Sequence, residues 1–312
     1  MGAYRIEVVR WTVEGIEICG LACLPEAPGS HPGVVILGPV AFVKEQSPLQ
    51  YATRLAQAGF ATLVFDPRYH GHSGGLPRRF ESGTAKVADL MAAVEYFAAH
   101  PAVDAARIYG LGICQGVNWL IEAATTMPQI QRVALVAGHY LLPETAALYL
   151  GGAEAVQRRI AAGEQAQSDF IATGTVHYIP IVSLTDANAL LVARPIYEWY
   201  IRWADRGPAW DFHGAWENRI TAMSEADIWR YQVDVPLRAL QTPTLMIHAD
   251  RAASGSEIPR RLFTTIPAAE KHLIWLEDQV QLQFYEDPLI LDRVVAYLAT
   301  WYRGGAQEVY SP

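Results

Sequence analysis

The sequence has 312 residues, of which 51% are apolar, and this composition buries a sizeable core and excludes a disordered chain. A net charge of −8 argues against a nucleic-acid partner, because phosphate binding needs a concentrated basic face. No uninterrupted apolar stretch reaches the roughly 18–20 residues that span a bilayer. The N-terminus also lacks the apolar core of a signal peptide. We therefore expect a soluble, cytoplasmic protein with no membrane partner.

The three cysteines, Cys19, Cys23 and Cys114, are too few and too odd in number for a disulfide framework. Cys19 and Cys23 have a metal-like spacing, but no second pair of Cys or His follows at a suitable distance. They are better interpreted as two small hydrophobic residues in an early strand. We expect neither a metal site nor a cofactor.

Short apolar runs alternate with helical patterns along the chain, which is typical of a mostly parallel, twisted sheet covered by helices on both faces. The opening strands are expected to form an antiparallel pair. In chain order, the first half is predicted to contain strands at 4–10, 16–24, 34–37 and 61–65, helices at 47–58 and 84–99, a strand at 107–111, a helix at 117–126 and a strand at 133–136.

The pattern changes after residue 140. Residues 141–237 read as largely helical and rich in aromatic side chains, and the alternation resumes with strands at 244–248 and 273–276 and a helix at 287–302. The sequence therefore predicts an α/β core made of 1–140 and 238–303, a helical lid insertion at 141–237 and a loose tail at 304–312. The aromatic residues of the insertion are Tyr197, Trp199, Tyr200, Trp203, Trp210, Trp216 and Trp229.

The most informative motif is the pentapeptide Gly112-Ile113-Cys114-Gln115-Gly116, which lies between a predicted strand and a predicted helix. This is the context of a nucleophile elbow, in which glycines two residues before and after the nucleophile let the strand and the helix approach closely. The turn places residue 114 at a helix N-terminus, where N–H groups favour an anion. We therefore expect Cys114 to ionise more readily than a free thiol. The competing interpretation is a buried packing cysteine.

With these motifs, the sequence resembles the α/β-hydrolase superfamily and, within it, the dienelactone-hydrolase-like branch. The resemblance covers most of the chain outside the predicted lid. It rests on the pentapeptide 112–116 and on four further stretches in the same order, namely Leu37-Gly38-Pro39, Val43-Lys44-Glu45-Gln46, the run from Phe65 to Gly75, and Phe284-Tyr285-Glu286-Asp287-Pro288.

The resemblance implies an oxyanion hole built from two backbone N–H groups. One belongs to Gln115, which follows the cysteine, and the other to Val40 or Ala41 in the loop after the strand 34–37. The family usually has glycines where this chain has Val40, Ala41 and Phe42, so we expect a narrower and more apolar cleft.

The catalytic triad that the resemblance implies is incomplete. Ala252 and Ala253 occupy the positions where the family has its acid, and Asp250 is offset by two or three residues. The family's histidine precedes a stretch like Phe284-Tyr285-Glu286, and alignment on that stretch places Gln281 there. Glutamine cannot titrate and only donates and accepts hydrogen bonds.

Three residues are candidates for a substitute base. Glu45 follows the strand 34–37, and dienelactone hydrolase has a glutamate that pairs with its cysteine at another point of the chain. His139 ends the strand 133–136, where some members of the superfamily place an acid. His70 lies in the loop after Asp66. For each, a loop hydrogen bond or a surface position is the competing interpretation, and His248 is expected to be a hydrogen-bonded core histidine.

Three functions are consistent with these residues. The first is acyl transfer, in which Cys114 attacks an ester, thioester or lactone carbonyl. The second is a non-hydrolytic reaction, such as a cyclisation, isomerisation, decarboxylation or retro-aldol step, that needs the oxyanion hole and no acyl-enzyme. The third is a binding protein without chemistry. The aromatic insertion favours a bulky apolar or aromatic small molecule as the partner, and a homodimer is left open.

Overall fold

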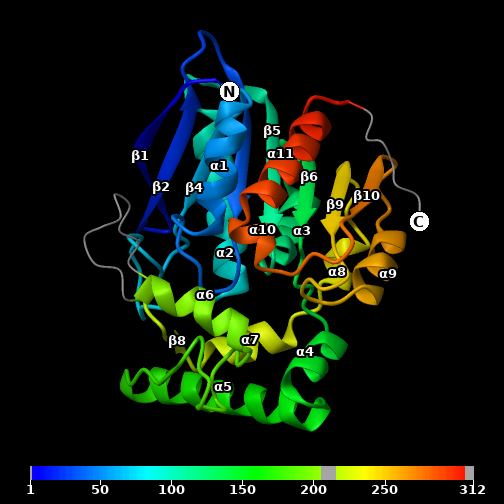
Figure 1. Ribbon diagram of the computed structural model, residues 1–312. Coiled ribbons are helices and arrows are strands. Elements are labelled where there is room, and N and C mark those ends of the chain that lie inside the picture. The colour runs from blue at the N-terminus through cyan, green and yellow to red at the C-terminus, as the bar shows by residue number, and fades with distance from the viewer. Residues whose placement is uncertain (1, 205–215, 306–312) are drawn as a thin grey trace.

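The computed structural model describes residues 2–204 and 216–305, and its core is one eight-stranded sheet (Figure 1). The strand order is β1-β2-β4-β3-β5-β6-β9-β10; β1 pairs antiparallel with β2 and β2 with β4, and the remaining pairs are parallel. The strands are β1 (Tyr4–Val13), β2 (Ile16–Pro25), β3 (His31–Leu37), β4 (Ala61–Phe65), β5 (Val103–Ile113), β6 (Ile130–Val136), β9 (Thr244–His248) and β10 (Lys271–Trp275).

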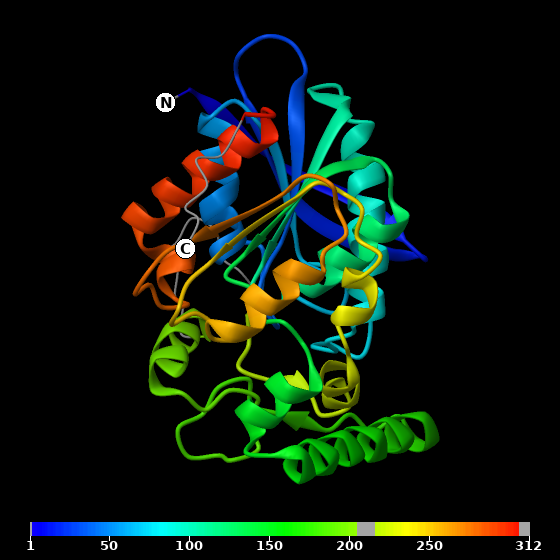
Figure 2. The same ribbon diagram turned by 90° about the vertical axis from the view of Figure 1, so that its right-hand side faces the viewer.

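Helices cover both faces of this sheet, as the chain's alternation predicts. Helices α1 and α11 pack on one face and α2 and α3 on the other (Figure 2). The core helices are α1 (Ser47–Gln57), α2 (Gly83–Ala98), α3 (Gly116–Thr126), α9 (Glu257–Thr265), α10 (Gln283–Glu286) and α11 (Pro288–Tyr302). The predicted α/β-hydrolase fold, with its mostly parallel sheet, is confirmed.

Residues 141–237 lie between β6 and β9 in the chain, and their described part gathers beyond the carboxyl edge of the parallel strands (Figure 1). This helical insertion also contains a two-residue ribbon, β7 with β8, which the sequence does not predict. Its elements are α4 (Pro143–Leu150), α5 (Ala153–Thr173), β7 (Tyr178–Ile179), α6 (Arg194–Ala204), β8 (Ile220–Thr221), α7 (Ser224–Arg230) and α8 (Asp234–Leu237). Trp210 and residues 306–312 of the predicted tail lie outside the described residues.

Helix α2 differs in one respect from an ordinary amphipathic helix. Its inner face buries Leu90, Val94 and Phe97, and it also buries Lys86 and Asp89. Buried charges require partners. Lys86 pairs with the carboxylate of Glu81, and Asp89 pairs with Arg68 at 2.7 Å. The hydrophobic pattern thus locates the helix but does not show that it carries two buried ions.

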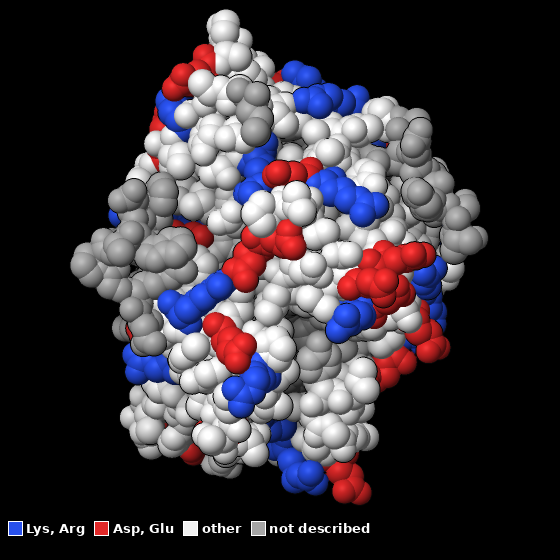
Figure 3. All heavy atoms as spheres, in the orientation of Figure 1, with Lys and Arg blue, Asp and Glu red and all other residues white. Residues whose placement is uncertain are grey.

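Acidic and basic side chains are interspersed on the face of the molecule that Figure 3 shows, without a field of one sign. Within residues 2–204 and 216–305, no helix combines the length and hydropathy that a membrane span requires. Cys19 and Cys23 are buried, unpaired residues of β2, as expected of small hydrophobic side chains.

Candidate active site

The parallel strands end at one edge of the sheet, and their loops carry the residues of the candidate site. Strand β3 leads into the loop that holds Val40 and Ala41, and β5 leads into Cys114. Ala253 follows β9, and Gln281 follows β10. Loops at the carboxyl ends of neighbouring parallel strands are where open α/β sheets bind ligands. The predicted site residues are therefore brought to one place by topology.

The turn from β5 into α3 has the strained geometry of a nucleophile elbow. Cys114 has a φ of 54°, in the left-handed region that a residue with a side chain avoids. A Cβ on Gly116 would lie 2.5 Å from the carbonyl oxygen of Leu37 and 2.6 Å from that of Gly38. A Cβ on Gly112 would lie 2.8 Å from the Cα of Val117. Both glycines are therefore required by contacts with backbone atoms, as the motif predicts.

Hydrogen-bond donors surround the sulfur of Cys114. The backbone N–H groups of Val40 and Gln115 and the hydroxyl of Tyr285 face it, and each favours its ionised form. The N–H of Ala41 donates instead to Oε2 of Glu81, at 3.2 Å. The N–H of Ala41 thus has a carboxylate acceptor, and of the two residues Val40 is the one whose N–H faces the sulfur.

Gln281, which the sequence alignment places where the family has its histidine, is buried and hydrogen-bonded on both sides of its amide. Its Nε2 donates to the hydroxyl of Tyr285 at 3.0 Å and to the carbonyl of Ala137 at 2.9 Å, and its Oε1 accepts from the N–H of Ala253 at 2.7 Å. These three partners fix which end of the amide is oxygen. Because the Tyr285 oxygen accepts from Gln281, its proton is free to be donated towards Cys114. A neutral chain of hydrogen bonds therefore runs from Ala253 through Gln281 and Tyr285 towards Cys114.

Tyr285 is the functional residue that sequence reasoning missed. It lies in the stretch 284–288 used for the resemblance, but nothing in its sequence context marks it as a neighbour of the cysteine. Burial, followed by the charge of Cys114, raises the pKa of Tyr285 well above its ordinary value. At neutral pH it is therefore a proton donor and not a base.

Burial raises the pKa of the Cys114 thiol above its ordinary value, although Tyr285, the two N–H groups and the ammonium of Lys86 all lower it. Cys114 is only 7% exposed under the insertion. Desolvation of the charged form outweighs the donors at the helix N-terminus. The expectation of an unusually acidic thiol is therefore wrong for the enclosed site.

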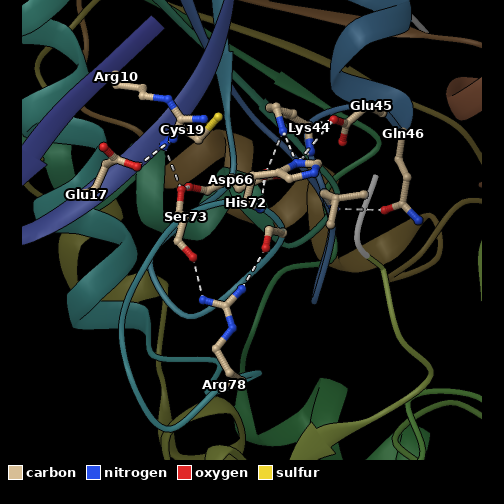
Figure 4. A network of polar contacts seen from close by, with 12 residues as sticks. Arg10, Glu17, Cys19, Lys44, Glu45, Gln46, Asp66, His72, Ser73 and Arg78 are labelled. Atoms are coloured by element: carbon tan, nitrogen blue, oxygen red, sulfur yellow. Dashed lines mark hydrogen bonds and ion pairs between the residues drawn. The ribbon is translucent and has the colours of Figure 1, made fainter. Parts of the chain in front are cut away.

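Glu45 belongs to a separate buried cluster next to the site (Figure 4). Its Oε1 lies 2.9 Å from Nζ of Lys44, which also pairs with Asp66 at 2.7 Å, and His72 packs against the same group. Burial, followed by the charge of Asp66, raises the pKa of Glu45. The described partners of Glu45 are Lys44 and His72, and no contact with Cys114 supports its predicted role as a base.

The two histidine candidates also have other surroundings. The backbone N–H of His139 donates to the carbonyl of Cys114 at 3.1 Å. Its ring packs against that of Tyr149 in the insertion, with ring centroids 4.6 Å apart. Burial lowers the pKa of His139 to about 4, so the ring is neutral at neutral pH. The ring of His70 lies between the carbonyl of Arg68 at 3.1 Å and Oε2 of Glu81 at 3.2 Å. His70 therefore reaches the site only through Glu81.

Two further predictions concern the loop after β9. The ring nitrogens of His248 lie 3.0 Å from the carbonyl of Ala249 and 3.1 Å from that of Gly138, which confirms a hydrogen-bonded core histidine. The carboxylate of Asp250 is exposed and accepts from the indole of Trp275 at 2.9 Å. Asp250 is therefore engaged at the surface, and the acid position holds only Ala252 and Ala253.

The insertion covers the site with aromatic side chains. Trp199, Tyr200, Trp203 and Trp216 are all buried, and Trp199 packs against Tyr285 with ring centroids 5.1 Å apart. A pocket of about 400 Å³ opens between the insertion and the core. It is lined by Leu148, Tyr149, Leu190, Val192, Ile196 and the loop from Ala252 to Gly255, with two further residues of the insertion.

Comparison with known proteins agrees with this fold. Residues 23–208 match the family described as serine aminopeptidase, S33. The uncharacterized protein PA2218 of Pseudomonas aeruginosa is 38% identical over 121 residues, which are 38% of this chain and 33% of that protein. A thiohydrolase, aneE of Aspergillus aculeatus, is 27% identical over 166 residues, which are 51% of this chain and 52% of that protein.

The chain thus spans between a third and about half the length of these two relatives in the sequence alignments. The crystal structure of PA2218 superposes with a TM-score of 0.78 at 24% identity, covering 97% of this chain and 94% of that one. At this identity the structural similarity shows the fold alone.

The elbow glycines make a first prediction. Replacing Gly116 by alanine (Gly116→Ala) drives a methyl group into two carbonyl oxygens, and we expect it to lower the free energy of unfolding by about 2 kcal/mol or more. The matched control is Gly74→Ala, whose Cβ would lie 3.3 Å from a methyl of Ile16 and 3.5 and 3.6 Å from backbone atoms of Glu17, without a contact below 3.0 Å. Urea denaturation followed by circular dichroism measures both. Equal midpoints for the two variants would refute the packing argument.

The surroundings of the sulfur make a second prediction. Because burial raises the pKa of Cys114, we expect its alkylation by iodoacetamide to reach half its maximal rate at a pH above the roughly 8.5 of a free thiol. Tyr285→Phe should move this midpoint further up, because it removes a donor to the thiolate. Mass spectrometry of the peptide that contains Cys114 gives the rates. A midpoint below that of a free thiol would contradict the prediction.

Proposed function

The chain belongs to the serine aminopeptidase S33 family of α/β hydrolases, and we propose that it transfers the acyl group of a thioester with an apolar acyl chain, using Cys114 as nucleophile. The observation that carries the proposal is the cysteine enclosed by the N–H groups of Val40 and Gln115, with the neutral Gln281–Tyr285 pair at the histidine's position. The thiohydrolase relative supports the substrate class.

The chemistry of sulfur explains why a triad histidine is dispensable for this substrate. Cys114 adds to the thioester carbonyl, and the N–H groups of Val40 and Gln115 stabilise the oxyanion. The C–S bond to the leaving thiol then breaks, and that thiol takes the proton that Cys114 gives up. A thiolate with a pKa of about 8.5 leaves without a strong acid, whereas an alkoxide or amine needs one. Tyr285 is placed to donate to either sulfur.

The acyl-enzyme must then pass its acyl group to water or to a hydroxyl group. The acceptor's O–H adds to the thioester of Cys114, the C–S bond breaks, and the acceptor's proton returns to the sulfur. Because no imidazole or carboxylate is hydrogen-bonded to the sulfur in the described part of the chain, this second step is the slow one. We therefore expect the acyl-enzyme to accumulate.

The pocket of about 400 Å³ supports an apolar acyl chain. Its wall includes Ala253, whose N–H is bound by Gln281, and Tyr149, whose ring packs against His139. Tyr149 also lies near Cys114, and burial, followed by the charge of Cys114, raises its pKa to about 12. The insertion acts as a lid, and the apolar part of the substrate lies between it and the core.

One observation favours a second candidate function. The sulfur faces three donors and no base, and three donors around an oxygen also stabilise an enolate. In a cyclisation, isomerisation, decarboxylation or retro-aldol step, Val40, Gln115 and Tyr285 would hold the substrate oxygen and Cys114 would not form a bond. This function is independent of the thiol's nucleophilicity, so a cysteine variant separates the two.

The test uses acyl thioesters of N-acetylcysteamine with short and medium chains, and thiol release as the assay. We expect Cys114→Ala to lose at least about 10²-fold in kcat/KM. Cys114→Ser should lose a similar amount, because a hydroxyl needs the base that the site lacks. Mass spectrometry should find the acyl group on Cys114. If Cys114→Ala keeps wild-type activity towards these thioesters, the nucleophilic role fails and the second candidate gains.

The neutral chain of hydrogen bonds yields a further prediction. The triple variant Cys114→Ser, Gln281→His, Ala253→Asp restores a serine triad, and we expect it to hydrolyse p-nitrophenyl esters about 10²-fold faster than Cys114→Ser alone. The control, Cys114→Ser with Gln281→Asn, keeps an amide at the histidine position and should show no gain. An equal rate for the triple and control variants would show that Gln281 does not stand in the histidine's place.

A further inference from the structure

The loop that carries the Val40 N–H has a strained backbone. Ala41 has a φ of 50°, in the left-handed region that glycine adopts freely and a residue with a side chain avoids. The chain nevertheless has Val40, Ala41 and Phe42 here, all buried. A strained conformation persists only where its surroundings determine it. The contacts of this segment therefore show what holds the N–H in place.

Two side chains of the helical insertion hold the carbonyl groups of this segment. The hydroxyl of Tyr200, on α6, donates to the carbonyl of Val40 at 3.1 Å. The indole N–H of Trp216 donates to the carbonyl of Ala41 at 3.0 Å. Tyr200 is 2% exposed and Trp216 is 4% exposed, and their rings pack 5.6 Å apart. Both hydrogen bonds are thus protected from water.

The core holds the same segment from the other side. Oε2 of Glu81 accepts from the N–H of Ala41 at 3.2 Å, and its other oxygen pairs with Lys86. Lys86 and His70 lower the pKa of Glu81 to about 2, against its burial, so the carboxylate is charged at neutral pH. The N–H of Glu81 donates to Oγ of Ser224 in the insertion at 2.9 Å. The peptide between Val40 and Ala41 is therefore held at both ends.

We infer that Tyr200 and Trp216 are positioning residues that complete the oxyanion hole only when the insertion is packed on the core. The inference rests on the proposed function, in which the Val40 N–H stabilises the oxyanion. If the insertion lifts, both carbonyl groups lose their donors, the strain at Ala41 is no longer offset, and the segment relaxes. The N–H of Val40 then turns away from the position of the substrate's carbonyl oxygen, which carries the negative charge after Cys114 attacks.

The principal test is Tyr200→Phe, which removes one hydroxyl and keeps the buried ring. We expect kcat to fall about tenfold with KM changed less than about twofold, because the donor is misplaced in the transition state while the pocket is unaltered. Trp216→Phe removes the indole donor and should act in the same direction. Thermal unfolding is measured beside each, so that a loss of folded protein is not read as a loss of rate.

The matched control is Tyr178→Phe. The hydroxyl of Tyr178 also joins the insertion to the core, by donating to the carbonyl of Arg78 at 3.3 Å, but it does not touch residues 40–42. We expect its kcat to equal that of the wild type. If Tyr200→Phe and Tyr178→Phe have the same kcat, the inference is overturned, whether both are slow or both are normal.

Amide hydrogen exchange separates this inference from the proposed function, because it needs no substrate. The N–H of Ala41 should exchange slowly in the wild type and about tenfold faster in Tyr200→Phe, with no change in Tyr178→Phe. If Cys114→Ala retains activity, the nucleophile proposal fails and the exchange rates alone decide the positioning role. Equal exchange in all three proteins would overturn it, even where Cys114 proves to be the nucleophile.

Discussion

The close packing of the β5–α3 turn against the end of β3 is the constraint on which the site depends. Gly116 lies against the carbonyl groups of Leu37 and Gly38, with no room for a side chain. This contact brings the loop after β3 within reach of Cys114, so that the N–H of Val40 faces the sulfur. Backbone packing therefore brings the Val40 N–H to the thiol, and the side chains of Tyr200 and Trp216 hold the segment there from the insertion.

Around this fixed turn, a neutral hydrogen-bond network joins the loops of the site. Gln281 links the loops after β6, β9 and β10 through Ala137, Ala253 and Tyr285. The charged groups lie one layer further out, at Glu81 with Lys86 and at Asp66 with Lys44. The neutral side chains of Gln281 and Tyr285 therefore supply hydrogen bonds, and the ion pairs Glu81–Lys86 and Asp66–Lys44 help to hold the loops.

Local sequence signals predicted the fold well, because strand runs, helix periodicity and turn glycines report on neighbouring residues. The elbow, the antiparallel opening strands and the absence of a histidine at 281 follow from such signals. The roles of Tyr285, Glu81 and Tyr200 do not, because each depends on a contact between segments far apart in the chain. The acidity of Cys114 was mispredicted for the same reason, since its burial is set by the insertion and not by the pentapeptide.

The amide of Gln281 carries no charge at any pH at which the protein is folded. The hydrogen bonds of Gln281 between the three loops consequently do not depend on pH. A histidine in the same place would gain a proton near its pKa of about 6.5 and change its hydrogen-bond pattern. Among the described groups that face the sulfur, the pKa of Tyr285 lies well above its ordinary value, and burial raises the pKa of the thiol itself. The hydrogen bonds by which Gln281 joins the three loops therefore stay the same when the pH changes.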